Sequence, residues 1–197
     1  MPVFHTLEDR VLDQIDAITD VVTAEHGDQV CAQGEMPTKV YFVLDGQVAL
    51  SSTAPDGSTA VVEVLRRGGD LVLASVMASL PYVQSAYAVQ STRLLAMQAE
   101  ELRALVEREP ALALSLLRGL SHGYRDLVRQ IRDLKVRTTA QRLGCYLLAL
   151  VPDSSASTAE LRLPFEKGLL AARLGCRQEN LSRAFAALRE LGVDTRG

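Results

Sequence analysis

A heptad stripe of apolar residues constrains this chain more than any other feature of its sequence. A helix that covers its own domain usually has a broad apolar face, whereas a narrow two-position stripe is typical of a helix that pairs with a copy of itself. The spacing therefore predicts a long helix over residues 109–136 that forms a homodimer interface; the alternative is a helix buried against its own domain. The stripe consists of six side chains at alternating intervals of three and four residues: Leu117, Leu120, Tyr124, Leu127, Ile131 and Leu134.

The region before this helix has the pattern of antiparallel β-structure. Short apolar segments at 39–44, 47–50, 60–65, 86–89 and 94–97 alternate with turn sequences such as Asp45-Gly46 and Pro55-Asp56-Gly57. Five or more strands at this spacing predict a sandwich or barrel that fills a first domain, residues 1–108. The first 25 residues are expected to form a short helical lead-in, with one apolar face made of Leu7, Val11, Ile15 and Ile18.

The last third of the chain has the spacing of a helix-turn-helix. An amphipathic helix is expected at 137–151, followed by a polar break at 152–158 and a short strand at 161–163. Ala171 is small where two helices would cross, and Gly175 suits a turn that requires positive φ. The second helix of the motif is expected at 177–191, within a second domain that spans residues 137–197. The apolar contacts between the two helices are assigned to Leu170, Leu174, Leu181 and Phe185.

The start of that second helix carries side chains that suit the major groove of DNA. Arginine can make a bidentate contact with guanine, glutamate accepts from the amino group of cytosine, and serine adapts to several bases. Arg173, on the first helix, is expected to contact a phosphate. We therefore expect duplex DNA as a partner; the alternative is an ordinary helical hairpin. The base-contacting candidates are Arg177, Gln178, Glu179, Ser182 and Arg183.

Composition narrows the class of protein. The net charge of −3 divides into −8 over residues 1–100 (5 basic, 13 acidic) and +5 over residues 101–197 (16 basic, 11 acidic), which suggests that only the second half meets a polyanion. No apolar run reaches the roughly 18 residues of a membrane span, and the acidic start lacks the order of a signal peptide. We expect a cytoplasmic protein without a membrane partner. The scattered Cys31, Cys145 and Cys176 argue against a disulfide framework or a metal site.

Two further classes of protein remain as alternatives. A cupin-like metalloenzyme needs histidine and carboxylate ligands inside the β-structure, and residues 28–97 contain no histidine. We therefore expect no enzyme activity. A sensor or scaffold subunit that does not bind DNA is the second alternative, and the helix-turn-helix spacing argues against it.

The order of these elements over residues 28–193 resembles the cyclic-AMP receptor protein/FNR family of bacterial transcription regulators. The resemblance implies an α+β fold: an antiparallel β-roll of the jelly-roll, cyclic-nucleotide-binding type, a dimerisation helix and a C-terminal winged helix-turn-helix. In the FNR branch a Glu-x-x-Ser-Arg run contacts the half-site, and Glu179, Ser182 and Arg183 match it, which implies a palindromic TTGAT-like operator. RNA polymerase is a further implied partner. The family's wing would start at residues 192–197, so the wing is expected to be incomplete.

The implied effector pocket departs from the cyclic-AMP pattern. Aligned on Ser85, the chain has Leu73 where the family binds the ribose and Gln84 where an arginine binds the phosphate, while Leu127 and Val128 would face the base. A cyclic phosphate buried without a cation lacks its main compensation, so we expect no response to cyclic AMP and leave the effector unknown.

A second departure is that the N-terminal cysteine cluster of FNR is absent, which argues against an iron–sulfur sensor. A looser similarity of segments 80–89 and 112–121 to the nitric-oxide-responsive haem regulators of denitrification leaves haem open as a cofactor. The candidate axial ligands are His5, His26 and His122, each of them expected on the surface.

Overall fold

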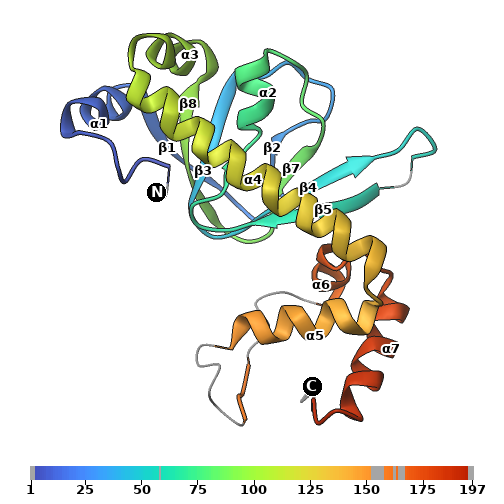
Figure 1. Ribbon diagram of the computed structural model, residues 1–197. Coiled ribbons are helices and arrows are strands. Elements are labelled where there is room, and N and C mark those ends of the chain that lie inside the picture. The colour runs from blue at the N-terminus through green and yellow to red at the C-terminus, as the bar shows by residue number, and fades with distance from the viewer. Residues whose placement is uncertain (1–2, 58, 152–157, 162, 164–166, 195–197) are drawn as a thin grey trace. The chain divides into compact units, whose positions relative to one another are not determined.

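The computed structural model of the protein describes residues 3–57, 59–151, 158–161, 163 and 167–194. The chain divides into two compact units, Met1–Arg125 and Asp126–Gly197, and the division falls inside one long helix. The helices and strands in chain order are α1 (Asp9–Asp16), β1 (Thr19–Ala24), β2 (Gln29–Cys31), β3 (Lys39–Asp45), β4 (Val48–Thr53), β5 (Thr59–Leu65), β6 (Asp70–Leu71), α2 (Leu73–Ala78), β7 (Ser85–Ala88), β8 (Thr92–Gln98), α3 (Ala99–Arg108), α4 (Pro110–Val136), α5 (Thr139–Leu150), α6 (Lys167–Arg173) and α7 (Gln178–Arg189) (Figure 1).

The first unit is a β-roll of two antiparallel four-stranded sheets. One sheet has the order β1-β8-β3-β6 and the other β2-β7-β4-β5. Adjacent residues of β3 point to opposite faces of its sheet, because side chains alternate along a strand. Val43 packs between the two sheets with Leu50 and Leu94, whereas Phe42 joins a core formed with the helices, in which Leu102 and Leu112 are buried. The predicted β-roll is confirmed.

The N-terminal segment differs from the helical lead-in expected over the first 25 residues. The helix α1 ends at Asp16, and the chain then forms strand β1, which pairs with β8 from Thr19↔Met97 to Ala24↔Thr92. Ile18 follows the helical spacing of Val11 and Ile15, but the β-branched residues after it favour an extended chain that can complete the edge of a sheet. The predicted helical lead-in is therefore wrong beyond Asp16.

A short helix that the sequence pattern did not predict lies between β6 and β7. Helix α2 is bounded by Val72 (φ 60°) and Ser79 (φ 54°), both in the left-handed region, which is uncommon for a β-branched residue such as valine. Leu73 and Val76 are fully buried in the core of the β-roll. Six residues are too few to display helical periodicity in a sequence.

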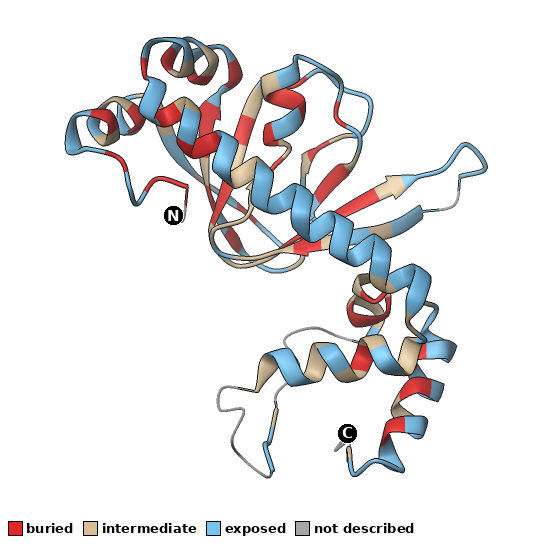
Figure 2. Ribbon diagram, in the orientation of Figure 1, coloured by how far each residue is buried: buried red, intermediate tan, exposed pale blue. Residues whose placement is uncertain are grey.

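The second half of α4 leaves the heptad stripe in solvent. Residues 121–132 are all exposed in the single chain, while Leu112 and Leu116, earlier in the same helix, are buried (Figure 2). Leu120 is the one stripe residue that packs partly against the core of the β-roll. We call the stripe the α4 seam; its other members are 45–68% exposed, namely Leu117, Tyr124, Leu127, Ile131 and Leu134.

The second unit contains the end of α4 and a three-helix core formed by α5, α6 and α7. Helix α5 begins with a capping box, in which Thr138 Oγ1 accepts from Gln141 N and Gln141 Oε1 accepts from Thr138 N. Leu161 and Leu163 lie in no strand, contrary to expectation, and Arg162 lies outside the described residues. Within the described ranges, no helix has the length and apolar character needed to cross a membrane.

Candidate nucleic-acid interface

The helix-turn-helix is formed by α6, a tight turn and α7. Leu170 and Ala171 on α6 are buried against Leu181 and Ala184 on α7, so the small residue lies at the close contact between the helices. Gly175 has φ +61°, and its amide donates to the carbonyl of Ala172 at 2.9 Å. A side chain at this φ is sterically unfavourable, which is why glycine occupies the turn. The predicted motif is confirmed, with α7 at Gln178–Arg189.

Helix α7 exposes three of the predicted DNA-contacting side chains on one face. At 100° per residue, Glu179 and Arg183 lie nearly opposite the buried positions Leu181 and Leu188, and Ser182 lies beside them. All three side chains are exposed. The hydroxyl of Ser182 donates to the carbonyl of Gln178 at 3.1 Å, one turn earlier. The helix therefore presents a carboxylate, a hydroxyl and a guanidinium together to solvent.

The remaining candidates flank this face. Arg177 is the exposed N-cap residue of α7, and its side chain makes no capping hydrogen bond. Gln178 is exposed in the first turn. Arg173 is half-buried in the last turn of α6, on the other side of the turn from the exposed face of α7.

Asn180 is a residue that the sequence analysis missed. It is exposed, and with Arg183 of α7 it lines a hollow whose opposite wall is the start of α5, at Thr138 and Thr139. The only sequence signal for Asn180 is its position between Glu179 and Ser182. Because the pairing of α5 with α7 is not visible in the sequence, this surface could not be predicted from it.

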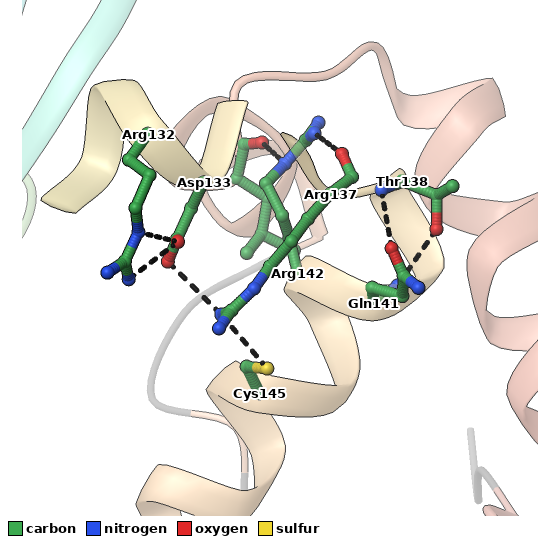
Figure 3. Close-up of polar contacts among 8 residues, drawn as sticks. Arg132, Asp133, Arg137, Thr138, Gln141, Arg142 and Cys145 are labelled. Carbon is green, nitrogen blue, oxygen red and sulfur yellow. Dashed lines mark hydrogen bonds and ion pairs between the residues drawn. The ribbon is translucent and has the colours of Figure 1, made fainter. Parts of the chain in front are cut away.

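Arg142 is a second residue that the sequence analysis missed. Its Nε donates to the carbonyl of Leu174 in the helix-turn-helix turn at 2.9 Å, and its Nη1 donates to the carbonyl of Arg137 at 2.8 Å. Figure 3 shows this guanidinium beside a chain of contacts that runs from Arg132 through Asp133 and Arg137 to Cys145. Arg142 is the only charged residue of α5, and a single charge in an otherwise uncharged helix was the sequence feature that could have pointed to it.

The candidate effector residues are divided between the two units. In the first unit Leu73 is fully buried in the β-roll core, Gln84 is half-buried, and the Ser85 hydroxyl accepts from the Gln33 amide at 2.9 Å. Leu127 and Val128 belong to the second unit and are 51% and 46% exposed. Leu73 is thus a core side chain of α2.

Cys31 and Tyr82 are buried in the β-roll, Cys31 on the strand that pairs with β7 and Tyr82 two residues before Gln84. Burial raises the pKa of the Cys31 thiol to about 11 and that of the Tyr82 phenol to about 12. The Tyr82 hydroxyl donates to the carbonyl of Lys39 at 3.0 Å. Both groups would be neutral at pH 7 even at their ordinary pKa values, and the upward shifts reflect their burial away from water.

The histidines do not fit an axial ligand for haem inside the β-roll. His5, His26 and His122 are all exposed, on three different segments. His26 Nδ1 lies 2.7 Å from the carbonyl of Val89 at the surface. An iron in an apolar pocket needs a ligand that points into the pocket. The three histidines therefore do not provide a haem ligand inside the β-roll.

Two family models match the chain: the cyclic nucleotide-binding domain over residues 21–109 and the Crp-like helix-turn-helix domain over residues 141–197. A solved structure from Silicibacter pomeroyi DSS-3, of a regulatory protein assigned as cAMP-binding, is 32% identical, with a TM-score of 0.66 over 95% of this chain and 84% of that one. The chain belongs to the cyclic-AMP receptor protein/FNR family. This family of DNA-binding transcription regulators includes both of the following relatives.

One relative is the cyclic AMP receptor protein of Thermus thermophilus, which is 28% identical to this chain over 192 residues. The matched region covers 98% of this chain and 87% of that protein. The second is the transcriptional activator protein FnrA of Stutzerimonas stutzeri, 26% identical over 189 residues, which are 92% of this chain and 77% of that protein. The predicted α+β architecture of a β-roll, a long helix and a helix-turn-helix is the architecture of this family.

Proposed function

We propose that this CRP/FNR family member is a homodimeric, effector-responsive transcription regulator that binds a palindromic operator with TTGAT-like half-sites. The single observation that carries the proposal is the exposed face of α7, on which Glu179, Ser182 and Arg183 lie together. RNA polymerase is the further partner that the resemblance implies.

We assign each proposed role to a different segment of the chain. Residues 1–108 bind the effector, residues 109–136 form the dimer, and residues 137–197 bind DNA. The α4 seam supports the second assignment, because its exposed apolar side chains have the spacing of a two-helix coiled coil. An effector would act by shifting an equilibrium between two arrangements of the recognition helices, which must lie roughly 34 Å apart, one turn of DNA, to occupy both half-sites.

Base recognition is tested by binding-site selection with the dimeric protein. Arg183 is expected to contact the guanine of the half-site, Glu179 the opposite cytosine and Ser182 a neighbouring thymine. Since a good bidentate contact gives about 1–3 kcal/mol of discrimination, Arg183→Ala should weaken binding roughly 5- to 150-fold per half-site and relax preference at that base pair. Arg173→Ala should instead weaken binding to all sequences and lower the salt slope by about one.

Arg189→Ala is the matched control for this experiment, because Arg189 lies on α7 in its last turn, away from the first-turn candidates. It should leave the selected sequence unchanged. An unchanged base preference in Arg183→Ala, or an altered one in Arg173→Ala, would contradict the placement of α7 in the major groove.

The effector class is tested with cyclic AMP itself. Leu73 offers no hydrogen bond to a ribose, and Gln84 offers no charge to a phosphate. We therefore expect titration calorimetry to detect no binding of cyclic AMP in the micromolar range. Micromolar affinity would show that this chain uses the ligand named for its Thermus thermophilus relative.

A further inference from the structure

The junction between α4 and α5 is short, and all of it belongs to the second unit. Only Arg137 and Thr138 separate the two helices. The amide of Arg137 donates to the carbonyl of Asp133, and the capping box with Gln141 satisfies Thr138. Two backbone carbonyls nearby follow the last residues of helices: that of Arg137 follows α4, and that of Leu174 follows α6. Such carbonyls have no donor within their own helix.

One guanidinium satisfies both of these carbonyls. Arg142 donates from Nη1 to Arg137 at 2.8 Å and from Nε to Leu174 at 2.9 Å, and its Nη2 lies 3.4 Å from Thr139 Oγ1. The planar guanidinium holds several donors in fixed directions, and a cation is favourable near helix C-termini. Arg142 therefore caps the ends of α4 and α6 at the same time.

A packing contact connects the same two places. A Cβ atom at Gly175 would lie only 2.5 Å from Cδ2 of Leu134, so the last seam residue of α4 lies directly against the turn of the helix-turn-helix. Gly175 is two residues before Arg177, the N-cap of α7. The orientation of α7 is thus tied to the last turn of α4 by one charged bridge and one apolar contact.

We infer that Arg142 is a positioning residue for operator recognition: it fixes the helix-turn-helix to the end of the dimer helix and so sets the distance between the two recognition helices of the dimer. The inference rests on the proposed function and adds to it a residue that touches no base. Its consequence is that the DNA-binding form of the dimer accepts half-sites at one preferred spacing, because each α7 is held on the last turn of its own α4.

The experiment compares DNA that contains a single half-site with DNA that contains two half-sites at spacings varied one base pair at a time. In Arg142→Met, affinity for the single half-site should stay within about twofold of wild type, since α7 is unchanged. Affinity for the preferred paired site should fall about 10- to 100-fold as the fixed geometry is lost, and neighbouring spacings should become equally acceptable. A residue that only stabilises the domain would not change spacing preference.

Arg129→Met is the matched control. Arg129 is exposed on α4, and its described ion pair is with Asp126 at 2.7 Å. The substitution removes one positive charge, as Arg142→Met does. It should keep the wild-type spacing preference. Wild-type spacing preference in Arg142→Met would overturn the inference, and so would the loss of single half-site binding at unchanged helix content.

Arg142→Lys provides the test if the methionine variant does not fold. A lysine ammonium can donate to one of the two carbonyls, but it lacks the planar set of donors with which a guanidinium reaches both. It should relax spacing preference in the same direction, and an unchanged preference would overturn the inference.

A readout without DNA separates this inference from the proposed function. If the wild-type protein binds no DNA, the proposed function fails, and residual dipolar couplings still decide whether Arg142 fixes α7 to the end of α4. The last turns of α4 and helix α7 should share one alignment in wild type and separate alignments in Arg142→Met. A shared alignment in the variant would overturn the role of Arg142.

Discussion

Gly175 is the residue at which turn geometry and packing can be separated by experiment. An alanine at φ +61° costs about 1–2 kcal/mol in backbone strain, and its Cβ would also meet Leu134. Gly175→Ala should therefore lower the free energy of opening of the helix-turn-helix, measured by hydrogen exchange of the α7 amides. In a Leu134→Ala background the same substitution should cost less, because only the strain remains. Equal costs in the two backgrounds would show that Leu134 does not press on the turn.

At the scale of elements, the ion pair between Arg10 of α1 and Glu109, between α3 and α4, should make the β-roll sensitive to acid. Two charged hydrogen bonds of 2.7 and 2.8 Å to the Arg10 guanidinium lower the pKa of Glu109. A carboxylate whose pKa is lowered by folding stabilises the folded protein fully at any pH above its ordinary pKa of about 4.3. This stabilisation is lost as the pH falls through the lower pKa that the carboxylate has in the folded protein.

Urea unfolding between pH 6 and pH 3 should therefore show a smaller loss of stability in Glu109→Gln than in wild type, although the variant is less stable at pH 6. Glu101→Gln, which changes an exposed side chain in the first turn of α3, is the control and should keep the wild-type pH dependence. If the pH dependence of Glu109→Gln equals that of wild type, the ion pair does not contribute to folding.

The elements that could be predicted are those whose structure follows from local sequence signals, and the others depend on contacts with distant residues. Strand β3 is an apolar run followed by Gly46, and β5 is an apolar run preceded by Gly57; both glycines have positive φ, so local signals sufficed. Strand β1 follows a helix whose spacing Ile18 continues, and its β-branched residues favour an extended chain only weakly until it pairs with β8. In the candidate site, the exposed face of α7 followed from periodicity, whereas Arg142 hydrogen-bonds a distant part of the chain and Asn180 lines a hollow shared with α5.

At the scale of the whole molecule, the α4 seam predicts the oligomeric state. Leu127 and Ile131 are 51% and 45% exposed, so Leu127→Glu with Ile131→Glu places charges on the seam without disturbing the core of a single chain. Sedimentation should give a dimer for wild type and a monomer for this variant. Leu120 is a poorer choice, because it packs partly against the β-roll. A variant that still sediments as a dimer would contradict the assignment of the seam.

The control for that experiment substitutes apolar residues of α4 that are equally exposed but lie off the seam. Leu114→Glu with Val136→Glu changes two such positions, which are 47% and 68% exposed. It should sediment as a dimer, because neither position follows the heptad spacing. Dissociation of this control would place the dimer contact on another face of the helix.

The solvent exposure of the α4 seam also bears on how such a regulator would respond to its own abundance. If a stable partner for the seam is a second chain, the binding-competent species forms by mass action from two molecules. At concentrations where single chains predominate, operator occupancy then rises with the square of the amount of protein. A twofold change in gene dosage would alter occupancy about fourfold in that range, so the promoter output would depend on expression level as well as on the effector.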